Sequence, residues 1–201
     1  QGEMPQLQNR EKDFFYLTGG SYPAVTETLL DMVQRRLPKQ YGFSSTADIQ
    51  VLCPSRMGQL GTMELNRRLQ ERLNPPSADK PEVKIFANLF RLGDKVMQIK
   101  NNYDILWKKC DGSAVGTGIF NGDVGIIQSV DLQLEMLTVV FDDREAEYDF
   151  TQLSELELAY AMTVHKSQGS EYRAVILTAW NGSPYLLSRS VLYTAVTRAR
   201  E

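Results

Sequence analysis

The sequence predicts an α/β fold in which a helix-covered parallel sheet is interrupted by a small antiparallel β-barrel. Two strand-helix units open the chain, helical spacing disappears from about residue 81 to residue 150, and the alternation then returns. Strands alternating with helices of this length favour a parallel sheet covered on both faces. We therefore predict a discontinuous α/β domain of residues 1–80 and 151–201, with an insertion of residues 81–150.

The first half of the α/β domain is predicted from apolar periodicity. An aromatic strand is expected at residues 14–17, and apolar positions at helical spacing predict a helix over 23–37 that Pro38 and Gly42 stop. The apolar run at 49–53 predicts a buried strand. A second amphipathic helix, over 63–73, carries several arginines and ends before an Asn-Pro-Pro sequence. These elements form two consecutive β-α units.

The insertion is predicted from short runs of β-branched and aromatic residues separated by Asn, Asp and Gly turns. The expected strands are Lys95–Ile99, Asp123–Ser129, Met136–Phe141 and Glu145–Phe150. Runs of this length joined by tight turns are typical of a small antiparallel barrel. The glycines at 116, 118 and 122 superficially resemble a phosphate loop, but no GK[ST] sequence follows them. We interpret them as hairpin turns.

Composition and charge restrict the partners. The chain has 201 residues, is 42% hydrophobic and carries a net charge of −3, so any contact with nucleic acid must be local. Its two cysteines show neither disulfide nor metal-ligand spacing, and no metal site is predicted. No apolar stretch approaches the ~20 residues of a membrane helix, and no signal peptide opens the chain. We therefore expect a soluble, cytoplasmic protein that does not contact a membrane.

Two polar clusters are the candidate functional segments. The apolar run from Ala159 breaks into a polar turn that ends at Glu171 and contains the only histidine of the chain. Taken alone, a lone histidine and lysine after a strand are more typical of a solvated loop than of a site. The last segment, 186–201, has apolar residues at helical spacing after Ser188, a residue suited to capping a helix. That spacing predicts a helix with Arg198 and Arg200 near its end.

These two segments resemble motifs V and VI of superfamily 1 DNA helicases. The motifs are TVHKSQGSE at 163–171 and YTAVTRAR at 193–200, and the HKSQG wording resembles the RecD-like 5′-to-3′ branch (RecD/TraA, exodeoxyribonuclease V alpha chain). The CPSR sequence at 53–56 and the GDKVM sequence at 93–97 fit the same branch. The resemblance implies a second RecA-like motor domain with an inserted SH3-like β-barrel. It also implies that the chain is a C-terminal fragment, with motifs I to III in a preceding RecA-like domain.

The resemblance implies roles for individual residues. Arg198 would be the arginine finger that stabilises charge during phosphoryl transfer. Arg56 would be a second γ-phosphate contact, or else a surface arginine. The implied nucleotide contacts are Gln168, Gly169 and Glu171, with the glutamate towards the ribose. The implied DNA contacts in the motif V turn are Thr163, His165, Lys166 and Ser167. An alternative interpretation is that these groups only cap the turn.

The insertion contains weaker candidates for DNA binding. Lys95, Asn102 and Tyr103 offer the cationic, amide and stacking contacts that tolerate any base. Turn-forming asparagines and a core tyrosine explain the same residues, and this structural interpretation is the favoured one. We keep both interpretations of this group.

The resemblance implies that the parent protein is an ATP-dependent DNA helicase that translocates on single-stranded DNA. ATP with Mg²⁺ would be bound mainly by the N-terminal motor domain, because this sequence contains no Walker A motif. The implied partners are single-stranded DNA, that N-terminal RecA-like domain, and recombination or repair proteins. The fragment alone is expected to be inactive as an ATPase. The alternative is a non-catalytic nucleic-acid-binding or adaptor module that keeps a helicase-like fold.

Overall fold

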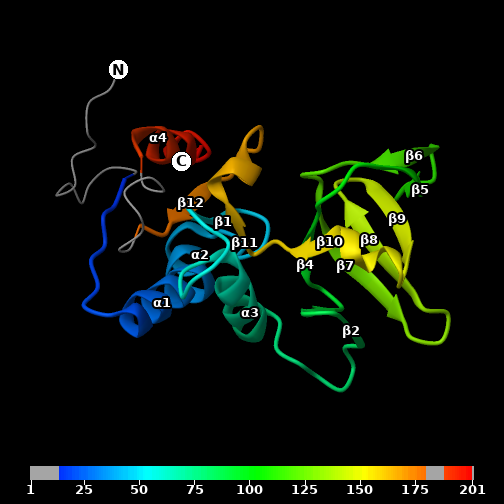
Figure 1. Ribbon diagram of the computed structural model, residues 1–201, viewed down its shortest axis with the longest axis horizontal. Coiled ribbons are helices and arrows are strands. Elements are labelled where there is room, and N and C mark those ends of the chain that lie inside the picture. Colours follow the sequence, from blue (N-terminus) through cyan, green and yellow to red (C-terminus); the bar gives the residue numbers. More distant parts are fainter. Residues whose placement is uncertain (1–13, 180–187, 201) are drawn as a thin grey trace.

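The computed structural model describes residues 14–179 and 188–200, which form two parts joined by short crossings (Figure 1). One part is a three-stranded parallel sheet in the order β11-β1-β12 with its helices, called here the parallel-sheet part. Its strands are β1 (Ile49–Cys53), β11 (Ala161–Thr163) and β12 (Ala174–Leu177). Every residue of β1 is buried, as expected for the central strand of a covered parallel sheet. The predicted α/β class is thus confirmed.

The helices of this part follow the predicted periodicity. They are α1 (Tyr22–Asp31), the π-helical turn η1 (Met32–Arg36), α2 (Leu37–Tyr41), α3 (Thr62–Leu73) and α4 (Arg189–Val196). Ser21 caps α1 by accepting a hydrogen bond from the N–H of Ala24 at 3.4 Å. Pro38 does not end the first helical segment, because it lies in the first turn of α2, where its missing N–H is not required. Gly42, the second of the two predicted stops, ends it in a left-handed conformation.

The strand predicted at residues 14–17 is wrong. These residues form no strand, and the side chains of Phe15, Tyr16 and Leu17 are each at least half exposed. High β-propensity does not produce a strand without a neighbouring strand to pair with. The parallel sheet of the described residues is complete with β11, β1 and β12.

The second part, called here the antiparallel-sheet part, is a seven-stranded sheet in the order β10-β4-β7-β8-β9-β5-β6. Its strands are β4 (Lys95–Gln98), β5 (Asn102–Lys109), β6 (Val115–Ile119), β7 (Val124–Asp131), β8 (Met136–Phe141), β9 (Arg144–Asp149) and β10 (Leu156–Leu158). The four predicted strands are present, and β5, β6 and β10 are additional. Among the described residues the end strands β10 and β6 do not pair, so the ladder is open where a closed barrel was expected. Register shifts in β5 and β7 bend it instead.

Short elements complete the connections between the two parts. The hairpin β2 (Glu82–Ile85) and β3 (Asn88–Arg91) follows α3, and a 3₁₀ turn η2 (Gln152–Glu155) precedes β10. β10 lies after residue 150 and still pairs with β4, so the antiparallel ladder extends to Leu158. None of the helices that the structure describes is long and apolar enough to cross a membrane.

Candidate functional site

The polar turn after β11 is a tight 3₁₀ turn, η3 (Val164–Ser167), that presents polar side chains outward. Val164 and Ser167 are buried, and the Ser167 hydroxyl donates to the carbonyl of Val164 at 2.8 Å. Gly169 follows with φ 88°, a left-handed conformation that favours glycine. His165, Gln168 and Gly169 are exposed. The turn therefore offers imidazole and amide groups to a ligand, whereas the hydroxyl of Ser167 is used internally.

The loop after β1 carries Arg56 to the same edge of the sheet. β1 and β11 are parallel, with Cys53 opposite Thr163, so the chain leaves both strands at one edge. The carbonyls of Ser55 and Arg56 accept the first N–H groups of α3. Gly61 makes this fold-back possible, because a Cβ there would lie 2.5 Å from the Arg56 carbonyl oxygen. Arg56 itself is exposed.

Glu157 joins the loop after β1 to the polar turn. Its carboxylate accepts from Arg56 Nη2 at 2.6 Å and from Lys166 Nζ at 3.1 Å. Arg56, Lys166 and Thr163 line one small cavity with Glu157. Two cations face one carboxylate here, so the cluster keeps a net positive charge at neutral pH. Sequence reasoning missed Glu157, because an acidic residue in the short strand β10 carries no motif.

Arg198 is held against the segment that follows the polar turn. α4 ends at Val196, so Arg198 follows the helix instead of lying in its last turn. Its Nη1 donates to the Ser170 carbonyl at 3.1 Å and its Nη2 to the Thr197 hydroxyl at 3.3 Å. Its Nε is buried without a hydrogen-bond partner among the described residues. A buried donor without a partner requires an explanation, and a bound ligand group is one.

The last residues of the chain are fixed by backbone pairing with Tyr172. The N–H of Tyr172 donates to the Arg198 carbonyl, and the N–H of Arg200 donates to the Tyr172 carbonyl, both at 2.8 Å. Arg200 also pairs with Glu171, with Nη2 2.6 Å from the carboxylate. Both side chains are more than half exposed, so this ion pair is weak and exchangeable. The structure thus brings the ends of both motifs together.

The predicted site residues fall into two groups. Thr163 and Lys166, predicted to bind DNA, lie with Arg56, which was predicted to contact the γ-phosphate. Glu171, predicted to face the ribose, lies instead with the end of the chain that carries Arg198. The structure groups Arg56 with residues of the predicted DNA set.

The candidates in the insertion differ in exposure. Lys95 is 4% exposed, and its ammonium group donates to the Thr46 carbonyl at 2.7 Å and to Gln50 Oε1 at 2.9 Å. It cannot line a surface path, because all four residues of β4 are buried in the middle of the molecule. Asn102 donates to Glu155 at 3.0 Å and is half-buried. Tyr103 is 66% exposed and remains accessible for stacking.

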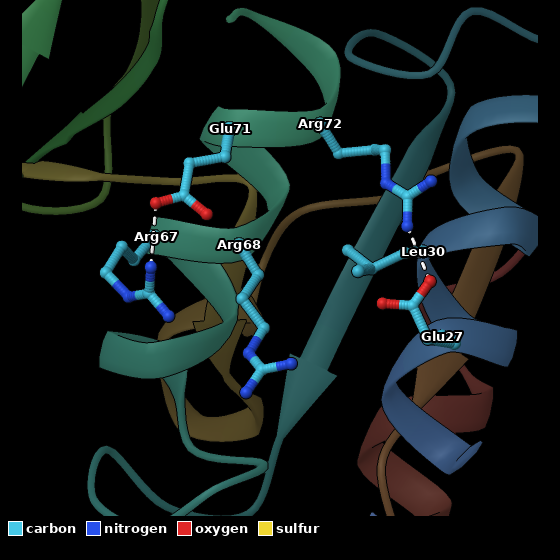
Figure 2. Close-up of a pocket in the computed structure, with 6 residues that line it drawn as sticks. All are labelled: Glu27, Leu30, Arg67, Arg68, Glu71 and Arg72. Carbon is cyan, nitrogen blue, oxygen red and sulfur yellow. Dashed lines mark hydrogen bonds and ion pairs between the residues drawn. The ribbon is translucent and has the colours of Figure 1, made fainter. Parts of the chain in front are cut away.

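A cavity lined by charged residues lies away from both groups. It measures about 360 Å³ and lies between α1 and α3 (Figure 2). Its lining residues are Glu27, Leu30, Arg67, Arg68, Glu71 and Arg72. Figure 2 shows Arg72 paired with Glu27 and Arg67 paired with Glu71. Hydrogen bonds from Arg67 and Arg68 lower the pKa of Glu64 to about 2. Glutamates of α1 and α3 neutralise these arginines. We therefore interpret the cavity as a gap between two helices that are joined by ion pairs, and not as a binding site.

Two family models match the chain. Residues 65–141 match the SH3 domain of ATP-dependent RecD-like DNA helicases, and residues 158–201 match the UvrD-like helicase C-terminal domain. Together these matches indicate a helicase fold of superfamily 1 type with an SH3 domain. The chain is therefore similar to the RecD-like DNA helicases, the branch that the two motifs resemble. The SH3-like character predicted for the insertion is confirmed.

Individual relatives agree with this placement. The chain is 38% identical over 153 residues to the ATP-dependent RecD2 DNA helicase of Deinococcus radiodurans, a match that covers 76% of this chain and 19% of that protein. It is 30% identical over 152 residues to the RecBCD enzyme subunit RecD of Mycobacterium tuberculosis, covering 75% of this chain and 23% of the subunit. The chain therefore spans about a fifth of the length of these relatives.

Solved helicase structures are similar at lower identity. A crystal structure of Pif1 helicase from Bacteroides in complex with ADP-AlF3 and ssDNA has a TM-score of 0.49 and 17% identity. The match covers 87% of this chain and 42% of that chain.

Proposed function

We propose that the chain is the second motor part of an ATP-dependent 5′-to-3′ DNA helicase that translocates on single-stranded DNA. In this proposal it supplies the arginine finger and the DNA-coupling turn, and a first RecA-like domain of the same parent protein supplies the Walker A loop. The observation that carries the proposal is the packing of the chain end against the motif V segment. Arg198 contacts Ser170, and Tyr172 pairs with the backbone on both sides of Ala199.

Arg198 is suited to act as the arginine finger. A finger must be held in place and must retain donors for a phosphate that arrives with the other domain. Backbone pairing with Tyr172 fixes the Arg198 main chain, and Nη1 and Nη2 each make a single hydrogen bond within the chain, which leaves each of them a second N–H. Its hydrogen bond to the Ser170 carbonyl links the guanidinium to the turn. Closure of the two motor domains onto Arg198 would therefore affect both the 163–171 and the 193–200 motifs.

The residues present are compatible with bound ATP and Mg²⁺. ATP supplies the γ-phosphoryl group for transfer to water, and the first motor domain would hold most of the nucleotide and the metal. Gln168 and Gly169 are exposed in the turn and would contact the nucleotide. Glu171 would face the ribose, since its exposed pair with Arg200 can open at little cost.

The other side of the turn is suited to DNA phosphates. Thr163, His165 and Lys166 would contact the sugar-phosphate backbone, which carries no sequence information. Arg56 lies beside Lys166 at the shared carboxylate of Glu157, so we assign it to the same DNA-binding surface. On the insertion, the exposed ring of Tyr103 would stack on a base. Ser167 would stabilise the turn from inside.

We also propose the division of the chain into a motor domain of residues 1–80 and 151–201 and an SH3-like insertion of residues 81–150. Each sheet has a hydrophobic cluster of its own, which supports this division. The fit is not complete, because β10 of the motor segment pairs with the insertion's sheet and a third cluster, with Leu52 and Met97, lies between the two sheets (Figure 1).

The proposal is tested by Arg198→Ala in the parent protein. We expect ATP turnover to fall by about 10³-fold, because an arginine finger contributes 10³ to 10⁵ in rate. Binding of single-stranded DNA should stay within about two-fold, since backbone and turn contacts supply it. Arg189→Ala, the same change in an exposed residue of the first turn of α4, is the matched control and should change neither quantity. Normal ATP turnover in the Arg198→Ala protein would reject the assignment.

The chain alone provides a second test of the same proposal. It has no Walker A motif, so the purified 201 residues should show no ATP hydrolysis above background. Addition of single-stranded DNA should not change that result. Robust hydrolysis by the purified chain would contradict the division of the motor into two parts.

A further inference from the structure

The chain passes between the two parts twice, and polar side chains occupy both crossings. The first crossing leaves α3 and enters β4 by way of the β2–β3 hairpin, and the second runs from β10 to β11 (Figure 1). The GDKVM sequence lies at the first crossing, and the proposed function gives it no role. Its Asp94 and Lys95 are both buried.

Asp94 links both crossings through one carboxylate. It is 0% exposed and accepts hydrogen bonds from Gln70 Nε2 at 2.5 Å, Asn74 Nδ2 at 2.8 Å and the Tyr160 hydroxyl at 2.9 Å. Gln70 and Asn74 lie in and directly after α3, and Tyr160 lies on the second crossing. The Asp94 carbonyl, in contrast, accepts from the N–H of Ile127 in the antiparallel sheet. The carboxylate also accepts from the N–H of Arg91 in β3 at 2.7 Å. The backbone of Asp94 thus pairs within the antiparallel sheet, while three of the four donors to its side chain come from α3, its C-terminal end and the second crossing.

Lys95 makes a second link next to the first. Its ammonium group reaches out of β4 to the Thr46 carbonyl and to Gln50 Oε1 of the parallel-sheet part. The amide nitrogen of Gln50 donates in turn to the carbonyls of Ala159 and Tyr160 at 3.2 and 3.1 Å. The side chain of Gln50 therefore binds both crossings. It accepts from Lys95 of the first crossing and donates to the backbone carbonyls of the second.

Asn66 of α3 fixes the second crossing from the other side. Its Nδ2 donates to the carbonyls of Leu158 and Ala161, both at 2.9 Å. Its Oδ1 accepts from the N–H of Ala161 at 2.7 Å. The chain between the last antiparallel strand and the first returning parallel strand is therefore bound by side chains over its whole length.

Rotation of one part against the other would break these contacts together. Each buried donor or acceptor left without a partner costs about 1–3 kcal/mol, and a buried charge costs more. Water cannot replace the partners, because Asp94, Lys95 and Gln50 are almost completely buried. We propose that Asp94 and Lys95 are positioning residues that lock the antiparallel-sheet part to the parallel-sheet part, so that the two move as one rigid body. This inference does not depend on the proposed enzymatic activity.

Distance measurements between spin labels on the two parts test this proposal in the 201-residue chain. Suitable positions are Lys39 in α2 and Gln133 between β7 and β8, both exposed. Cys110 is exposed and would be replaced by serine to prevent labelling there, whereas Cys53 is buried. We expect one narrow distance distribution in the otherwise unchanged chain. Asp94→Ala should at least double its width, because three side-chain donors lose their acceptor.

Two Tyr→Phe variants test the proposal if Asp94→Ala fails to fold. Tyr160→Phe removes one buried hydrogen bond between the parts, and Tyr148→Phe removes one of similar length, to Gln98, inside the antiparallel-sheet part. Only Tyr160→Phe should broaden the distribution, while near-ultraviolet circular dichroism shows both variants folded. A broad distribution in the unchanged chain would overturn the proposal. An unchanged width in folded Tyr160→Phe and Asp94→Ala would also overturn it.

Discussion

The junction between the two sheets and the candidate site use similar charged residues in opposite environments. At the junction, Asp94 and Lys95 are at most 4% exposed and are bound by neutral amides, a hydroxyl and a carbonyl. At the site, Arg56 and Lys166 share Glu157, and the Arg56 side chain is 57% exposed. Buried groups cannot exchange a protein partner for water, whereas exposed pairs can.

This difference separates two roles for the polar motifs of the chain. Hydrogen bonds at the junction fix one arrangement, because any other arrangement leaves charges unpaired in the interior. The ion pairs at the site hold their side chains only loosely and remain available to phosphates. Polarity alone does not mark a binding residue, and Lys95 was predicted to bind DNA for that reason alone. Exposure decides which role a polar residue has.

The largest effect on stability should come from the Asp94 carboxylate. Asp94→Ala leaves the amides of Gln70 and Asn74 and the hydroxyl of Tyr160 without their acceptor. We expect the free energy of unfolding to fall by about 3 kcal/mol or more. Burial raises the pKa of the Asp94 carboxyl, and the hydrogen bonds it accepts oppose that rise. Chemical denaturation followed by circular dichroism at pH 7 measures the loss.

Asp149→Ala is the matched control for this prediction. Asp149 is exposed and accepts local hydrogen bonds from the backbone of Thr151 and Gln152. Its removal should cost less than about 1 kcal/mol, the size of an exposed capping contact. Equal losses in the two variants would show that the junction contributes no more than a surface turn.

The second prediction concerns the pH dependence that Lys95 gives to stability. Burial lowers the pKa of Lys95 to about 8 from the ordinary value of 10.5. Between pH 8 and pH 10.5 the lysine is protonated in the unfolded chain and largely neutral in the folded chain. The unfolded chain therefore binds more protons, and the contribution of Lys95 to the free energy of unfolding rises with pH. From pH 7 to pH 9 the increase should be about 1 kcal/mol. Above pH 9 the buried thiol of Cys53, with a pKa raised to about 12, acts in the opposite direction.

Lys95→Met isolates this contribution. The variant should lack the rise between pH 7 and pH 9, as measured by urea denaturation at several pH values in that interval. Lys108→Met removes an exposed lysine that pairs with Glu145 and should leave the slope unchanged. If the unchanged chain and the Lys95→Met variant showed parallel pH profiles, the ammonium group of Lys95 would not be desolvated as described.

Much of the fold follows from the sequence, because periodicity reports burial directly. The helix α3 and the strand β8 were predicted nearly to the residue, since each has a clear apolar period and ends at turn residues. β10 was not predicted, because three residues are too few to show a period and their pairing with β4 is set by the second crossing. The strand predicted for the aromatic run at 14–17 was wrong, because these residues have the propensity of a strand but no partner strand to pair with.

The candidate site was only partly predictable. Short motifs identified the segments that contain Thr163 and Arg198, but motifs carry no information on which segments meet in space. The grouping of Arg56 with Lys166 depends on Glu157, which lies in a different sheet. The burial of Lys95 depends on both sheets packing against β4. Such contacts between distant segments require the tertiary structure.

The smallest predicted effect concerns the half-buried carboxylate of Glu157 at the site. Glu157→Gln removes the negative charge that Arg56 and Lys166 share and leaves both cations free for DNA phosphates. We expect binding of single-stranded DNA to tighten by about three-fold, with a steeper dependence of the affinity on salt, because more counterions are released. Fluorescence anisotropy with labelled oligonucleotides at several salt concentrations measures both quantities. Glu147→Gln makes the same charge change at an exposed position of β9 and should alter neither. If the two variants bind DNA alike, the Glu157 cluster does not face DNA, and Arg56 would have to be reassigned.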